Sequence, residues 1–309
     1  MFPDNNWYGH KFILSKYLGI KEKQIFGSLQ HGWISQFIYP FKEKNIRFYP
    51  LLFWTKNMEE FYKKKKILNV TSIGSPFLYL CKLYENRKKN KKPNGTLIFA
   101  SHSSQDLKQK TDHNLLINEV QKKFKGPYTI CFYYYDLRDE VINIYKKKNW
   151  CVICCTRSRV DKFSLIRQYI EIQKHKTIVC GELCSALFYA MYLKKETSVH
   201  FNSNERLNNY TVQEKDMVKS YNKIYPNLFN GVLPAEQGYF LSLKELGFDC
   251  IKSKTQLKKI LGFNSITKQI LCNLYSKIYD MKYGKELRQG LDLNEENLKK
   301  YKKAALNEY

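Results

Sequence analysis

Short apolar runs alternate along the chain with longer segments whose apolar residues recur at helical spacing. The runs predicted to be strands cover residues 24–30, 46–54, 67–73, 96–100, 128–134, 150–155 and 177–180. The helices predicted between them cover 11–18, 58–65, about 112–124, 140–147, 163–173 and 186–193. Within one of these helices, Phe163, Ile166 and Ile170 fall on a single face. Strands that alternate with helices predict βαβ units and parallel sheets.

One segment, residues 85–94, interrupts this pattern because it contains no aliphatic or aromatic side chain. It is the strongest linker candidate, and the strand and helix pattern restarts after it. We therefore predict an α/β fold with two Rossmann-type, doubly wound domains facing a central cleft, over residues 1–90 and 91–210. Residues 211–309 are predicted to form a helical segment that packs back on both domains, with helices near 257–261, 270–279 and 295–305.

The strand predicted at 96–100 ends abruptly in polar residues. Its apolar side chains are followed directly by His102, Ser103 and Ser104. A buried parallel strand delivers such groups to its carboxyl end, which is where open α/β sheets place their ligand sites. These three residues are therefore candidate ligands for a bound molecule, although a capping or structural role for His102 remains open.

A second junction of this kind follows the strand predicted at 177–180. Gly181 and Glu182 form a tight turn, and Ser185 precedes an apolar segment predicted to be a buried helix. A helix start presents backbone N–H groups, and its dipole favours an anion there. We predict that Ser185 contacts a phosphate, or caps the helix, or does both. Glu182 is predicted to contact a ribose or sugar hydroxyl, or to face water.

Candidate groups in the amino-terminal half are fewer. His31 lies in a Gln-His-Gly turn, where an imidazole can accept a proton near neutral pH, donate to a phosphate, or simply pack as a ring. Asp4 and His10 are alternatives that the sequence does not rank. Gly74, two residues before Pro76, predicts a tight turn between the domains, and we include it among the ligand-binding candidates.

Charge narrows the classes of partner. The chain has 53 Lys and Arg against 28 Asp and Glu, a formal net charge of +25 that attracts anionic partners. Lysine predominates in the basic runs at 63–66, 87–92 and 146–148, whereas base reading and bidentate phosphate binding favour arginine. The runs therefore indicate solvated faces of the protein, a protein surface that faces an anionic membrane, or a composition bias of the coding sequence. No nucleic-acid-binding motif is present, so we expect no nucleic-acid partner.

The nine cysteines do not indicate a metal site. Cys151 and Cys154 have CxxC spacing, but they lie within a predicted buried strand, and no second ligand pair follows. Their number and setting predict a reducing, cytoplasmic compartment. We find no secretory signal and no apolar run long enough to span a bilayer, so any membrane association is expected to be peripheral, at the inner face.

Four short motifs, taken in order, resemble those of bacterial surface-carbohydrate glycosyltransferases of the two-Rossmann-domain, or GT-B, kind. They lie at residues 27–33, 73–79, 100–104 and 181–190. The likeness is strongest to enzymes that transfer sialic-acid-like nonulosonates or Kdo from a CMP donor. It implies an acceptor-side domain at 1–90, a nucleotide-sugar-binding domain at 91–210, and no metal or other cofactor. It also implies that His102, Ser103, Ser104 and Ser185 bind the donor phosphate. The amino-terminal half is short for such an enzyme.

The chemistry implied by this resemblance has two requirements, which are stabilising the departing phosphate and deprotonating an acceptor hydroxyl. His102 and the serine hydroxyls suit the first requirement, and His31 suits the second. The expected partners are a nucleotide-sugar donor, a surface polysaccharide or lipooligosaccharide acceptor, and an anionic membrane surface. Two alternatives remain open: a glycerophosphotransferase that uses a CDP-glycerol-type donor, and a non-catalytic nucleic-acid-binding protein.

Overall fold

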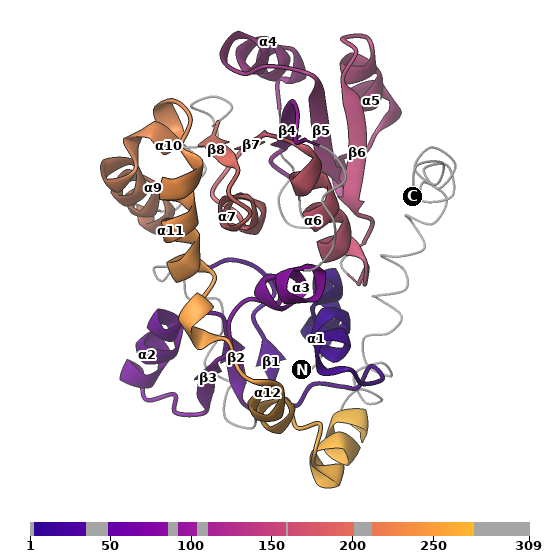
Figure 1. The fold of residues 1–309 in the computed structure, drawn as a ribbon, viewed down its shortest axis with the longest axis vertical. Helices are drawn as coiled ribbons and strands as arrows, with labels where there is room; N and C mark the ends of the chain where they lie inside the picture. Colours follow the sequence, from indigo (N-terminus) through magenta and orange to yellow (C-terminus); the bar gives the residue numbers. More distant parts are fainter. Residues whose placement is uncertain are drawn as a thin grey trace.

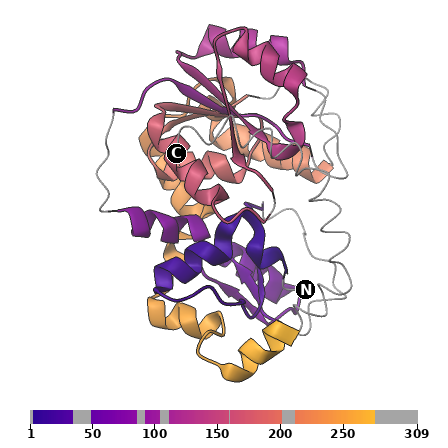
Figure 2. The ribbon, with the colours of Figure 1, turned by 90° about the vertical axis from the view of Figure 1, so that its right-hand side faces the viewer.

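The computed structural model describes residues 3–34, 49–85, 92–103, 111–158, 160–200 and 212–274. Two α/β units lie one above the other along the long axis of the molecule, each built around its own parallel sheet (Figure 1). The helices that follow the second sheet run alongside it and then cross back to the first unit (Figure 2).

The first sheet has three parallel strands in the order β1-β2-β3: β1 (Ser28–Leu29), β2 (Leu51–Phe53) and β3 (Val70–Ser72). Alternate residues of β2 face opposite sides. Phe53 packs with α2 (Lys56–Lys64), whereas Leu52 belongs to the core that includes α1 (His10–Leu18) and α3 (Pro76–Tyr84). Helices therefore cover both faces of this small sheet.

The second sheet has five parallel strands in the order β6-β5-β4-β7-β8. Their bounds are β4 (Thr96–Phe99), β5 (Tyr128–Tyr133), β6 (Cys151–Thr156), β7 (Thr177–Cys180) and β8 (Glu196–Val199). One face packs with α4 (His113–Lys123) and α5 (Asp139–Lys146), the other with α6 (Ser164–Lys174) and α7 (Ser185–Tyr192). The order reverses at β4, where doubly wound sheets open a ligand crevice. The predicted fold class, α/β with two Rossmann-type units, each around a parallel sheet, is confirmed.

The remaining described helices join the two units. α9 (Val212–Ile224), α10 (Pro226–Asn230) and α11 (Ala235–Glu245) lie beside α7 and β8, and α12 (Lys254–Ile260) packs on α1. The chain returns through Gly247, which has a φ of 67° and leaves no room for a Cβ against the Trp54 carbonyl. Glycine is required there because the crossing backbone touches the end of β2.

Several elements differ from the sequence expectation. The sequence pattern did not predict α3, β8 or α9 to α11, and β1 to β3 are shorter than predicted. The segment of α3 is almost continuously apolar because the helix is buried, so it shows no helical periodicity. The helix expected at 295–305 lies outside the described residues. The domain boundaries at residues 90 and 210 also fall on such residues and stay predictions.

Two glycines at the ends of α1 allow a matched test of the contact between the units. Gly9 and Gly19 both have left-handed backbones, with φ of 80° and 67°. A Cβ on Gly9 would overlap the Lys162 carbonyl of the second unit, whereas a Cβ on Gly19 would meet nothing within 4 Å. We expect Gly19→Ala to lower the free energy of unfolding by about 1–2 kcal/mol, the cost of a left-handed backbone. Gly9→Ala should lower it further, because the Lys162 loop must move.

Urea unfolding of both variants measures the difference. Equal losses would show that the contact between Gly9 and Lys162 does not help to hold the two units together.

Candidate functional site

A cavity of about 380 Å³ lies where the carboxyl ends of the two sheets meet. Its first wall comes from the turn after β1 and from the start of the chain. Its second wall comes from the ends of β4, β5 and β6 and from the turn that leads into α7. Its polar and aromatic lining includes Tyr8, His10, His31, Trp33, His102, Tyr133, Gln168, Glu182 and Ser185. The cavity is therefore composite, and neither unit forms it alone.

His102 lies just past β4 at the edge of this cavity. Its side chain is exposed, its Nδ1 lies 3.1 Å from the Ser103 carbonyl oxygen, and its ring centroid lies 4.7 Å from that of Tyr133. A hydrogen bond from Nδ1–H to that carbonyl leaves Nε2 as an acceptor in the neutral ring and as a donor in the protonated ring. The Ser103 amide donates to Asp136 at 2.8 Å, which fixes the turn. Ser103 does not line the cavity, and Ser104 lies outside the described residues.

The amino-terminal end of α7 opens onto the same cavity. Its N-cap residue, Cys184, makes no side-chain capping bond, and the Leu187 amide donates to the Cys184 carbonyl at 3.2 Å. Among the described residues, the Ser185 and Ala186 N–H groups are therefore the ones available to a ligand. The Ser185 hydroxyl accepts a hydrogen bond from the Trp33 amide at 2.7 Å. Ser185 therefore joins the two units as well as lining the cavity. The helix dipole favours an anion at this position.

Two histidines of the first unit line the facing wall. The His31 ring meets Trp7 edge-on, with ring centroids 4.5 Å apart. Burial, and then the nearby His31, lower the pKa of His10 to about 3, against the opposing effect of a hydrogen bond to the Gln30 backbone. His10 is therefore neutral near pH 7. Its buried Nδ1 has no hydrogen-bond partner among the described residues.

The structure brings together four of the seven predicted site residues: His31, His102, Glu182 and Ser185 all line the cavity. Gly74 differs from the expectation. It follows β3 with a φ of 76°, and a Cβ there would lie 3.1 Å from the Gly247 carbonyl oxygen. Gly74 lies outside the cavity because its turn supports the crossing chain that leads to α12.

Sequence reasoning did not identify the aromatic residues that complete the cavity. Trp33 donates its indole N–H to Glu245 of α11 at 2.7 Å, and its ring lies 4.7 Å from Phe188 of α7. Tyr8 and Tyr133 face each other across the cavity, with their hydroxyl oxygens 3.5 Å apart. The only early signal was the Trp-Tyr-Gly-His sequence at residues 7–10, where a glycine beside bulky rings indicates a close approach of the backbone.

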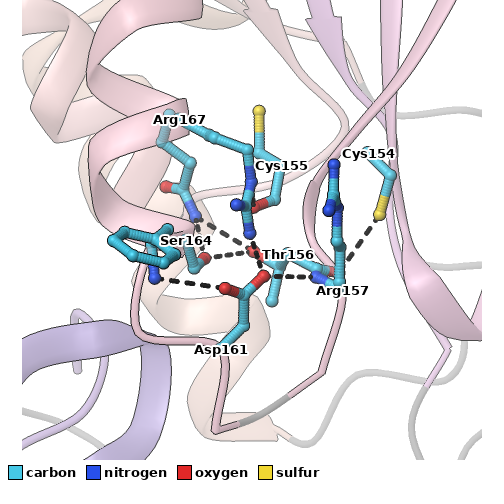
Figure 3. A network of polar contacts seen from close by, with 9 residues as sticks. Cys154, Cys155, Thr156, Arg157, Asp161, Ser164 and Arg167 are labelled. Atoms are coloured by element: carbon cyan, nitrogen blue, oxygen red, sulfur yellow. Dashed lines mark hydrogen bonds and ion pairs between the residues drawn. The ribbon is translucent and has the colours of Figure 1, made fainter. Parts of the chain in front are cut away.

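Hydrogen bonds and an ion pair among its own residues and those of α6 hold the loop between β6 and α6 in place (Figure 3). The Asp161 carboxylate accepts hydrogen bonds from the Arg157 and Phe163 amides, at 3.0 and 3.1 Å, and pairs with the Arg167 guanidinium. Arg167 also donates through Nε to the Cys155 carbonyl at 2.9 Å. This network fixes the loop that carries Lys162, the residue against which Gly9 packs.

Comparisons with known proteins do not assign the chain to a family. No family model matches the chain, and no curated protein matches it. Among solved structures, a crystal structure of TarM is similar at a TM-score of 0.33 and 13% identity, over 84% of this chain and 52% of that one. The chain thus spans about half the length of TarM. A likeness at this level does not bear on function.

Two further statements hold for the residues that the structure describes. No three histidine, cysteine or acidic side chains there lie close enough together to hold a metal ion. No helix there has the length and apolar character needed to cross a membrane.

Burial of a neutral His10 predicts a pH dependence of stability. Its pKa is about 3 in the folded protein, against about 6.5 when unfolded, so the unfolded state binds the extra proton between these values. Stability is therefore lost as pH falls below about 6.5, at up to about 1.4 kcal/mol per pH unit from this residue. His10→Phe should reduce that slope, as measured by urea unfolding between pH 6.5 and 5. Identical slopes in both proteins would show that His10 is not buried as a neutral ring.

Proposed function

We propose that this protein is a glycosyltransferase that transfers a sugar from a nucleotide-activated donor, with the donor phosphate bound in the cavity between the units. One observation supports this most. The carboxyl ends of strands from both sheets, the open start of α7 and the His102 ring all meet at one cavity. Open α/β sheets bind nucleotides at such carboxyl ends, and helix starts bind their phosphates.

The donor phosphate is held, in this proposal, by the N–H groups at the start of α7 and by His102. As the bond between the anomeric carbon and the phosphate breaks, negative charge grows on the departing oxygen. Preorganised N–H donors around that oxygen stabilise the charge. The His102 ring adds a further hydrogen-bond donor, and we propose that the reaction requires no metal. Ser185 orients the start of α7 through its bond to the Trp33 amide.

The acceptor hydroxyl is activated from the facing wall. We assign this step to His31, which takes the proton while the hydroxyl oxygen bonds to the anomeric carbon and the nucleotide departs with the bonding electrons. A general base of this kind works best with a pKa near the operating pH. His10 does not suit the step, because a group with a pKa of about 3 is a weak base.

The identity of the sugar, the donor and the acceptor is proposed from the motif resemblance. We propose an acidic, nonulosonate-type sugar, a CMP donor, and a surface polysaccharide or lipooligosaccharide acceptor at the inner face of the membrane. The net charge of +25 supports attraction to acidic substrates and anionic lipid, at about 1 kcal/mol per basic residue near such a surface. Added salt should then release the protein from anionic vesicles.

Thermal unfolding with a panel of ligands tests the donor class. CMP, UMP, UDP and GDP, each at millimolar concentration, are compared with their nucleosides. A ligand that binds only the native state raises the melting temperature, so at least one nucleotide should stabilise the protein more than its nucleoside does. If no nucleotide shifts the melting temperature, the proposed function is wrong. The mass added to an acceptor then separates sugar transfer from glycerophosphate transfer.

His102 provides the sharpest test of the chemistry. His102→Gln keeps a polar side chain but removes the titratable ring, so we expect hydrolysis or transfer of the sugar nucleotide to fall about 100-fold. His113→Gln is the control, because His113 bonds to Tyr145 at 3.0 Å and lies outside the cavity. Its activity should match the wild type below its melting temperature. Full activity in the His102 variant would contradict the assigned role.

A further inference from the structure

The backbone of Tyr8 has a conformation that its side chain disfavours. Its φ is 55° and its ψ is 15°, in the left-handed region, where a bulky residue other than glycine is an outlier. Such residues persist only where their surroundings impose the conformation, and they occur preferentially at binding and catalytic sites. Tyr8 lines the cavity, so we ask what imposes its backbone conformation and what its side chain does there.

The cause is the contact between the two units. Gly9 packs so closely on the Lys162 carbonyl that no Cβ fits between them. The loop that carries Lys162 is itself fixed by the bonds of Asp161 and Arg167 (Figure 3). Gly9 lies directly before α1, so the chain turns from this contact into the helix at Tyr8 and Gly9, whose φ values of 55° and 80° are both left-handed. The left-handed turn at Tyr8 directs its ring into the cavity.

The hydroxyl of Tyr8 reaches the facing wall. It lies 3.5 Å from the hydroxyl of Tyr133, at the end of β5, and no other group among the described residues hydrogen-bonds to it. Hydroxyl pairs usually bond at 2.7–2.8 Å, so this contact is long. An oxygen atom placed beside the pair, at the apex of a triangle with the two hydroxyl oxygens, would lie within ordinary bonding distance of both. The Tyr133 ring also packs beside His102, with centroids 4.7 Å apart.

We propose that Tyr8 is a substrate-binding residue that, together with Tyr133, donates a hydrogen bond to one oxygen of the donor phosphate. This inference rests on the proposed function and adds to it a phosphate contact from the amino-terminal unit. An anion suits the position because two hydroxyl donors converge there, beside His102. Among the lining residues, Glu182 alone carries a carboxylate. Hydrogen bonds from hydroxyls to an anionic oxygen are shorter and stronger than those between neutral groups.

Phosphate binding by Tyr8 and Tyr133 would link the two units. Tyr8 belongs to the first and Tyr133 to the second, so the phosphate oxygen joins them directly. Phosphate binding then stabilises the arrangement in which the units face each other, and a nucleoside without phosphate does not.

The test is isothermal titration of the wild type, Tyr8→Phe, Tyr133→Phe and Tyr17→Phe with CMP, UMP, UDP and GDP and with the matching nucleosides. Tyr8→Phe removes only the hydroxyl and keeps the ring, so it should fold normally. Tyr17→Phe is the matched control, because the Tyr17 ring packs on that of Tyr79, with centroids 4.8 Å apart, and lies outside the cavity. We expect Tyr8→Phe and Tyr133→Phe each to weaken nucleotide binding about tenfold or more, the usual effect of a lost bond to a charged group. Nucleoside binding should not change.

The outcomes separate the two proposals. If a nucleotide binds the wild type and Tyr8→Phe equally well, the inference about Tyr8 is wrong and the proposed function stands. Equal weakening of nucleotide and nucleoside would show that the hydroxyl does not contact phosphate, which also overturns it. If no nucleotide binds the wild type, the proposed function is wrong and the inference fails with it.

Discussion

The candidate site depends on two parallel sheets being held with their carboxyl ends toward one cavity. Two close contacts between the units help to hold that arrangement. Gly9 packs on the Lys162 carbonyl, and the Trp33 amide donates a hydrogen bond to the Ser185 hydroxyl. Each joins a turn of the first unit to a turn of the second. Because each wall of the cavity belongs to a different unit, any change in these contacts alters the distances between groups on the two walls.

The chemistry of the two walls differs in a way that suits group transfer. The second unit supplies donors for an anion, namely the open start of α7 and His102. The first unit supplies two imidazoles, of which His10 is kept neutral by burial. In the proposed function, the second unit holds the phosphate, and His31 of the first unit accepts the proton. The Tyr8 hydroxyl, from the first unit, extends the donor side across the cavity.

The sequence predicted the second unit more accurately than the first. Its central strands are buried on both faces, so they appear as continuous apolar runs, and the run at 177–180 matches β7 residue for residue. His102 and Ser185 were found because polar residues follow such runs directly. Tyr8 and the true position of Gly74 were not predictable, because contacts with Lys162 and Gly247, far along the chain, determine them. Local patterns carry no information about such long-range approaches of the backbone.

We propose that the cavity between the units binds the phosphate of a nucleotide. A crystal structure of the protein soaked in turn with CMP, UDP and GDP tests it most directly. We expect density for a phosphate within hydrogen-bonding distance of the first N–H groups of α7 and of His102, with the nucleoside extending along the ends of β4 to β6. A well-ordered nucleotide bound anywhere else on the molecule would contradict it.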